Sequence, residues 1–163
     1  MKETNEKIER KVFDLLKSKG MTFASAESCT GGNIAHLITL IPGSSVVFRG
    51  GAVTYATPTK TKVLGVSKEF IDNDGVVSQR VVESMAQGTR DLYEADFGVA
   101  TTGVAGPSGG TEETPVGTVW IGVAGKHGTI SELCHFGKGR SKVIRQATLK
   151  AYELLYEAIR TNL

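Results

Sequence analysis

The chain has 163 residues, a length that fits one domain and allows roughly 70% of the unfolded surface to be buried. Hydrophobic residues make up 40% and charged residues 22%, which excludes wholesale disorder and a fibrous class. The 19 basic and 17 acidic residues leave a net charge of +2, too balanced for a nucleic-acid footprint, so we expect no nucleic-acid partner.

Cellular context and bound metals can also be predicted from composition. Residues 1–11, "MKETNEKIERK", lack the apolar core of a signal peptide, and no apolar run approaches the roughly 20 residues of a membrane span. We therefore expect a cytoplasmic protein without membrane attachment. Cys29 and Cys134 fit no CxxC pattern and are predicted to be reduced thiols. The three histidines show no ligand spacing, so neither a metal nor another cofactor is expected.

The first third of the chain predicts a helix, a strand and a second helix. The first helix ends near Gly20 and has apolar residues at helical spacing, namely Ile8, Val12, Leu15 and Leu16. "MTFASAE" (21–27) predicts a short buried strand, and "GGNIAHLITLIPG" (31–43) a helix closed by a proline and a glycine. The segment "AESCTGG" (26–32) is therefore expected on a strand-to-helix turn.

The middle of the chain continues this alternation. "SVVFRGGAVTYAT" (45–57) indicates a strand with a bulge or bend at Gly50 and Gly51, and "PTKTKVLG" (58–65) a short helix with Pro58 at its first position. A loop with Asp72, Asn73 and Gly75 is expected next. Ser78 then caps a predicted helix whose inward residues are Val81, Val82, Met85 and Ala86.

The last third predicts three strands and a closing helix. "DFGVATTG" (96–103) indicates a buried strand, and "GVAGPSGGTEETPVG" (103–117) a long loop of the kind that carries function. "TVWIGVAG" and "TISELCHFG", separated by "KHG", predict an antiparallel hairpin. The final helix, from Ser141 to about Arg160, places inward Val143, Ile144, Ala147, Leu154 and Leu155. The order predicts an α/β fold, a single three-layer α/β/α sandwich domain over residues 1–163 with a mixed parallel/antiparallel sheet.

Several familiar catalytic signatures are absent from the sequence. The glycine-rich segments never complete GxGxxG, which disfavours a Rossmann dinucleotide site. No GxxxxGK[ST] is present, so a P-loop NTPase is not expected. No SxxK is present either, which argues against the simplest serine–lysine hydrolase pattern.

The turn at 26–32 concentrates reactive side chains. The hydroxyls of Ser28 and Thr30 can cap the following helix, and capping alone explains a hydroxyl at such a position most of the time. Glu27 is harder to explain by packing, since a carboxylate at the end of a buried strand needs a partner or a shifted pKa. Cys29 could be a nucleophile, but a small buried hydrophobic role is favoured.

Two later segments add a base and an anion site. Tyr55 ends a strand and Lys60 lies in the next helix, so an ammonium could favour the phenolate and produce a base. "GKGRSK" (137–142) combines glycine amides with Lys138, Arg140 and Lys142 at a helix start, a chemistry suited to phosphate. Thr102 presents a hydroxyl to the long loop.

Five segments in order resemble one known family. They are "AESCTGG", "PGSSVVFRGGAVTYATPTK", "TGVAGPSGG", "PVGTVWIGVAG" and "GRSKVIRQAT". Together they resemble the C-terminal domain of competence/damage-inducible protein A, the nicotinamide mononucleotide deamidase family. The resemblance implies hydrolysis of the carboxamide of nicotinamide mononucleotide to nicotinate mononucleotide and ammonia, in NAD recycling. It also implies self-association as a dimer or higher homo-oligomer. The chain departs from many members at Ala56-Thr57-Pro58, where they have Ser-Asn after the tyrosine.

The resemblance assigns roles to individual residues. The family's motif positions fall on Ser28, Ser45, Tyr55, Lys60, Thr102, Arg140 and Arg145. The resulting hypothesis has Ser28 as nucleophile, Tyr55 and Lys60 sharing the proton transfers, and Glu27 orienting the lysine or the amide nitrogen. Amides around Thr30 to Gly32, Gly31 included, would stabilise the oxyanion. Arg140, with or without Arg145, would hold the phosphate, and the loop from Gly103 to Gly110 would cover the ribose.

Three alternatives remain open from the sequence. A water activated by Tyr55 or Glu27 could replace Ser28 as the nucleophile. A cysteine-dependent amidase could act through Cys29, and the domain could bind a nucleotide without catalysis.

Overall fold

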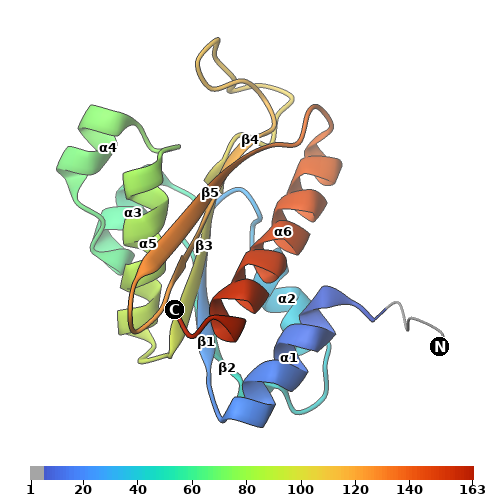
Figure 1. Cartoon of the computed structure of the whole chain (residues 1–163). Coiled ribbons are helices and arrows are strands. Elements are labelled where there is room, and N and C mark those ends of the chain that lie inside the picture. The colour runs from blue at the N-terminus through green and yellow to red at the C-terminus, as the bar shows by residue number, and fades with distance from the viewer. Residues whose placement is uncertain (1–5) are drawn as a thin grey trace.

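The computed structural model describes residues 6–163, which form a five-stranded mixed sheet with helices on both faces (Figure 1). The strands are β1 (Phe23–Glu27), β2 (Phe48–Val53), β3 (Phe97–Gly103), β4 (Thr118–Ala124) and β5 (Thr129–His135). Their order in the sheet is β2-β1-β3-β4-β5. β1 pairs in parallel with β2 and β3, whereas β4 pairs antiparallel with β3 and β5. The expected α/β fold with a mixed sheet is confirmed.

The helices form one layer on each face of the sheet (Figure 1). One layer contains α1 (Ile8–Lys19), α2 (Asn33–Thr39) and α6 (Arg140–Arg160), and the other contains α3 (Thr57–Leu64), α4 (Lys68–Asp74) and α5 (Gln79–Leu92). A single 3-10 turn, η1 (Ser44–Val46), leads into β2. None of the helices in residues 6–163 combines the length and hydrophobicity needed to cross a lipid bilayer.

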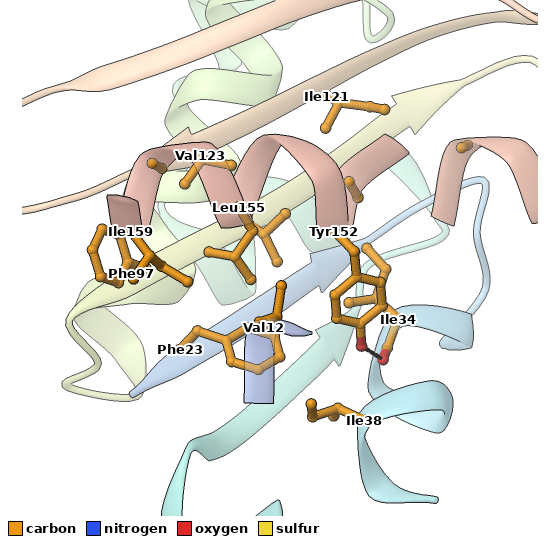
Figure 2. Close-up of a cluster of buried hydrophobic side chains, with 14 of the residues drawn as sticks. Val12, Phe23, Ile34, Ile38, Phe97, Ile121, Val123, Tyr152, Leu155 and Ile159 are labelled. Atoms are coloured by element: carbon orange, nitrogen blue, oxygen red, sulfur yellow. Dashed lines mark hydrogen bonds between the residues drawn. The ribbon is translucent and has the colours of Figure 1, made fainter. Parts of the chain in front are cut away.

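The larger hydrophobic cluster fills the space between the sheet and the α1, α2 and α6 layer (Figure 2). Tyr152 of α6 is buried there, and its hydroxyl donates a hydrogen bond to the Ile34 carbonyl at the start of α2. Burial raises the pKa of Tyr152, so its hydroxyl stays protonated and remains a donor. This contact ties the first turn of α2, which follows the segment 26–32, to the longest helix of the domain.

The second cluster lies under α5 on the opposite face. The four residues expected to point inward from α5, Val81, Val82, Met85 and Ala86, are all buried. Gly98 of β3 allows this close packing, because a Cβ at that position would collide with the Ala86 carbonyl. Both faces of β1 and β3 are therefore covered, which explains why these strands are almost entirely apolar or small.

The structure corrects the expectation for residues 68–74. The sequence predicted a loop around Asp72 and Asn73, but these residues belong to α4. Phe70 and Ile71 of α4 pack against the second cluster, and this burial stabilises a helix that its polar residues do not favour. A bulge is present in this strand but lies one residue before the predicted Gly50–Gly51 position, since the pairing of β1 with β2 passes from Phe48 to Gly50 and skips Arg49. Pro58 is the second residue of α3, not the first.

Candidate active site

A cavity of about 650 Å³ lies at the carboxyl ends of β1 and β3, next to the segment that follows β2. Ligands of α/β sheets commonly bind at this edge, where loops from several strands meet. The walls come from the turn after β1, the start of α3, the segment between α4 and α5, the β3–β4 loop and the first residue of α6. Of the residues predicted from sequence, the cavity brings together Ser28, Tyr55, Lys60, Thr102, Gly103 and Arg140.

Ser28 and Lys60 are in contact in this cavity. The Nζ atom of Lys60 lies 3.0 Å from Ser28 Oγ and donates a second hydrogen bond, of 2.5 Å, to the Thr54 carbonyl. β1 and β2 end in register, with Glu27 opposite Val53, so the residue after each strand emerges at the same edge. The helix α3 then begins at once and turns Lys60 back toward Ser28.

The environment of Lys60 destabilises the ammonium form of its side chain. The side chain is 1% exposed, and among residues 6–163 it forms no ion pair with a carboxylate. Burial lowers the pKa of Lys60 below its ordinary value, and a weaker electrostatic effect of Cys29 opposes this. A neutral amine beside a hydroxyl can accept the hydroxyl proton, so the pair has the geometry of a base and its nucleophile.

Cys29 lies in the cavity wall but is almost fully buried. Its side chain is 6% exposed, and burial raises the pKa of the thiol to about 11, while a hydrogen bond with Thr101 opposes the rise. A thiol with this pKa carries very little thiolate at neutral pH, and the thiolate is the nucleophilic form. The expected burial of Cys29 is confirmed, and the structure disfavours Cys29 as a nucleophile.

The rate of alkylation reports how much reactive, accessible thiolate Cys29 carries. At pH 7.5 we expect iodoacetamide to modify Cys29 more than about tenfold slower than free cysteine, because the raised pKa removes thiolate and burial limits access. Mass spectrometry of the peptide containing residue 29 gives the rate separately from that of Cys134. Modification as fast as free cysteine would contradict the predicted thiol state and restore Cys29 as a candidate nucleophile.

Glu27 does not contact Lys60, contrary to the role expected for it. The side chain is 1% exposed and lies outside the residues that line the cavity. Its carboxylate accepts hydrogen bonds from Thr30 Oγ1 at 2.7 Å, the Ile34 amide at 2.8 Å and the Ala35 amide at 3.1 Å. Glu27 therefore caps α2 from the preceding strand.

Tyr55 is paired with Arg140, although the sequence suggested a pair with Lys60. Arg140 Nη2 donates to the Tyr55 hydroxyl at 2.8 Å, and Nη1 donates to the Gly106 carbonyl at 2.6 Å. Arg140 begins α6, so one side chain connects α6, the β3–β4 loop and the segment after β2. A guanidinium has five N–H donors, which leaves three of them for a ligand in the cavity.

Besides Glu27, four of the residues predicted from sequence do not line the cavity, and a fifth, Thr102, lines it but has its hydroxyl bound to the backbone. Thr30, Gly31 and Arg145 line a neighbouring hollow between α2 and α6. The Gly31 amide donates to the Ser28 carbonyl at 3.1 Å, so it is not free to stabilise an oxyanion. Ser45 is exposed in η1 and is not among the residues that line the cavity. Thr102 Oγ1 donates to the Val76 carbonyl at 2.9 Å, which holds the segment before α5 against β3.

Sequence reasoning missed several residues of the site. Thr54 supplies the carbonyl that holds Lys60, Thr57 lines the cavity, and Thr101 contacts Thr30 at 2.9 Å between hydroxyl oxygens. Residues 73–77 also line the cavity, and only their position in a predicted loop could have suggested this. A useful signal for Thr101 is that it lies near the carboxyl end of a predicted strand, whereas Thr54 directly follows the observed end of β2.

Comparison with known proteins places the chain in a family. The model of the CinA C-terminal domain matches residues 5–159. A CinA-like protein of Flavobacterium psychrophilum is 44% identical over 160 residues, 98% of this chain and 38% of that protein. A CinA-like protein of Desulfosudis oleivorans is 50% identical over 149 residues, 91% of this chain and 36% of that protein. The chain thus spans less than two fifths of the length of these curated relatives.

A solved structure agrees with this assignment. The competence/damage inducible protein CihA from Agrobacterium tumefaciens superposes with a TM-score of 0.91 at 36% identity, over 94% of this chain and 93% of that chain. The chain belongs to the CinA C-terminal domain family.

Proposed function

We propose that this domain hydrolyses the carboxamide of nicotinamide mononucleotide to nicotinate mononucleotide and ammonia. The observation that carries the proposal is the contact between Ser28 Oγ and buried Lys60 Nζ in a cavity that also presents Arg140. Amide hydrolysis needs an activated nucleophile and a proton donor for the leaving amine, and this pair can supply both. A mononucleotide also needs an anion site, for which Arg140 is suited.

The proposed reaction proceeds through an acyl-enzyme. Neutral Lys60 takes the hydroxyl proton of Ser28 as Oγ bonds to the carboxamide carbon. The C–N bond then breaks, and the lysine ammonium returns its proton to the departing nitrogen, which leaves as ammonia. A water molecule, deprotonated by Lys60, then attacks the ester carbon. The bond to Oγ breaks, and Lys60 returns the proton to Oγ, which regenerates Ser28 and the neutral amine. The acid product loses its proton to solvent and leaves as the carboxylate. During each attack the ammonium lies beside the developing oxyanion and stabilises it.

The phosphate is assigned to Arg140 in this proposal, and not to Arg145. Arg140 lines the same cavity as Ser28, whereas Arg145 lines the neighbouring hollow. The hydrogen bonds from Arg140 to Tyr55 and Gly106 hold the guanidinium in place before a ligand arrives, which reduces the entropy lost on binding. The segment from Gly103 to Gly109 forms the adjacent wall, where a ribose would lie.

One incubation tests the function. The purified chain is incubated with nicotinamide mononucleotide, and ammonia and nicotinate mononucleotide are measured in equal amounts if the proposal is correct. Thermal stabilisation by the nucleotide without ammonia would instead indicate a binding module. An inactive Cys29→Ser variant together with fast thiol alkylation would indicate the cysteine-dependent alternative.

Replacing Arg140 with alanine is expected mainly to raise KM. A phosphate that is bound equally in the ground and transition states contributes to KM and not to kcat, and loss of a charged contact costs about 2–3 kcal/mol, or roughly 30- to 150-fold. Steady-state kinetics of Arg140→Ala and Arg145→Ala give the comparison. An equal or larger increase in KM for Arg145→Ala would contradict the assignment of the phosphate to Arg140.

A further inference from the structure

A buried chain of hydrogen bonds runs behind Ser28, on the side away from the cavity. It contains Glu27, Thr30 and Thr101, which are 1%, 3% and 0% exposed. Thr30 Oγ1 lies 2.7 Å from Glu27 Oε1 and 2.9 Å from Thr101 Oγ1. The proposed reaction assigns no step to any of these groups, and Thr101 was not a candidate from sequence.

The direction of this chain follows from its chemistry. Glu27 Oε1 accepts from Thr30, so the single hydroxyl proton of Thr30 is used. The contact between the two threonines must then be donated by Thr101. The hydrogen bonds therefore run from Thr101 to Thr30 to Glu27. The chain ends at the Glu27 carboxylate, which accepts three hydrogen bonds.

These contacts hold the residues on both sides of Ser28. Glu27 precedes it and also binds the amides of Ile34 and Ala35, which closes residues 27–35 into a compact turn. Thr30 follows it two positions later and is held by the Thr101 hydroxyl. The Ser28 amide itself donates to the Thr101 carbonyl at 3.2 Å. The backbone that carries Oγ therefore has little freedom to turn away from Lys60.

We infer that Glu27, Thr30 and Thr101 are positioning residues that hold Ser28 Oγ at its 3.0 Å distance from Lys60 Nζ. The inference rests on the proposed role of Ser28 as nucleophile, but not on the identity of the substrate. Loss of one hydrogen bond in the chain displaces the turn, and misplacement of a nucleophile by about 1 Å can cost on the order of 100-fold in rate. Substrate affinity depends on the cavity wall, so it should change little.

The test compares two reactions of Ser28 in four variants. Phenylmethanesulfonyl fluoride reports on the serine without any nucleotide, since Oγ displaces fluoride and forms a sulfonate ester, and mass spectrometry follows the labelling. Turnover of nicotinamide mononucleotide gives kcat and KM. Thr101→Val removes the hydroxyl that donates to Thr30. Glu27→Gln removes the charge and replaces the oxygen that accepts from the Ala35 amide with an NH2 donor. Thr101→Ser retains the hydroxyl, and Thr89→Val is the matched control. Thr89 is fully buried and binds the Ser25 carbonyl, away from the cavity wall.

We expect Thr101→Val and Glu27→Gln to slow labelling and kcat by about 10- to 100-fold, with KM changed less than about threefold. Thr101→Ser and Thr89→Val should stay within about threefold of the unaltered protein. If Glu27→Gln does not fold, Thr101→Val carries the test. Labelling of Thr101→Val at the normal rate, equal slowing in Thr89→Val, or no labelling of Ser28 in the unaltered protein would each overturn the inference. If labelling slows in the variants as expected but the unaltered protein releases no ammonia, the proposed function is contradicted and the inference stands.

Discussion

Ser28→Ala is expected to reduce the rate of ammonia release from nicotinamide mononucleotide by about 10³- to 10⁶-fold, because removal of the nucleophile of a catalytic unit has effects of this size. KM should change little, since Ser28 is one small residue among many that line the cavity. The measurement is kcat and KM from ammonia release, with acyl-enzyme formation followed by mass spectrometry in the unaltered protein.

Ser18→Ala is the matched control for Ser28→Ala. Ser18→Ala removes an exposed hydroxyl on α1 that binds the Leu15 carbonyl, so it should leave kcat within about twofold. Full turnover by Ser28→Ala would exclude the covalent mechanism. Water would then be the nucleophile, and Lys60 would be its nearest base.

Lys60→Met is expected to lower kcat by about 10²- to 10⁴-fold, the usual contribution of a general base. Methionine keeps much of the side-chain volume but can neither accept the Ser28 proton nor donate to the leaving nitrogen. Lys62→Met is the matched control, because Lys62 is an exposed lysine of the same helix. A Lys60→Met variant with the activity of Lys62→Met would show that another group activates the nucleophile.

The pH dependence of activity and of stability follows from the lowered pKa of Lys60. Activity requires the neutral amine, so kcat/KM rises with pH through the folded-state pKa, which lies below the ordinary lysine pKa of 10.5. In the window between the folded and unfolded pKa the unfolded chain binds more protons, so the free energy of unfolding rises with pH there. Below that window the lysine is protonated in both states, and the full cost of burying the ammonium opposes folding.

Thermal denaturation of the two lysine variants checks the sign of this effect. The melting temperature of Lys62→Met should follow that of the unaltered protein at each pH. As the pH rises through the window, the melting temperature of Lys60→Met should fall relative to those of the unaltered protein and of Lys62→Met. The reason is that Lys60→Met lacks the lysine whose burial becomes less costly there. A difference between Lys60→Met and Lys62→Met that is independent of pH would contradict a lowered pKa for Lys60.

Local patterns in the sequence determined most of the fold. Of the elements in residues 6–163, all five strands and five of the six helices were predicted from apolar periodicity, from Gly20 and from buried runs of small residues. Each of these signals depends only on residues of a single element, so it can be recognised in the sequence. The helix at Lys68–Asp74 was the exception, since its stability comes from Phe70 and Ile71 packing on residues distant in the chain. Ordered motifs over most of the chain also predicted the family, which the comparisons confirm.

The sequence by itself therefore determined most of the elements, the mixed sheet, the family and several of the residues that gather at one sheet edge. Only the tertiary structure decided which of those residues touch. No SxxK motif is present, yet Ser28 and Lys60 meet across 32 positions because β1 and β2 are parallel and end in register. The contacts of Glu27 with α2 and of Tyr55 with Arg140 likewise differ from the pairings with Lys60 that the sequence suggested. Such contacts depend on register and on the crossing of distant segments, and neither is encoded in the local spacing of residues.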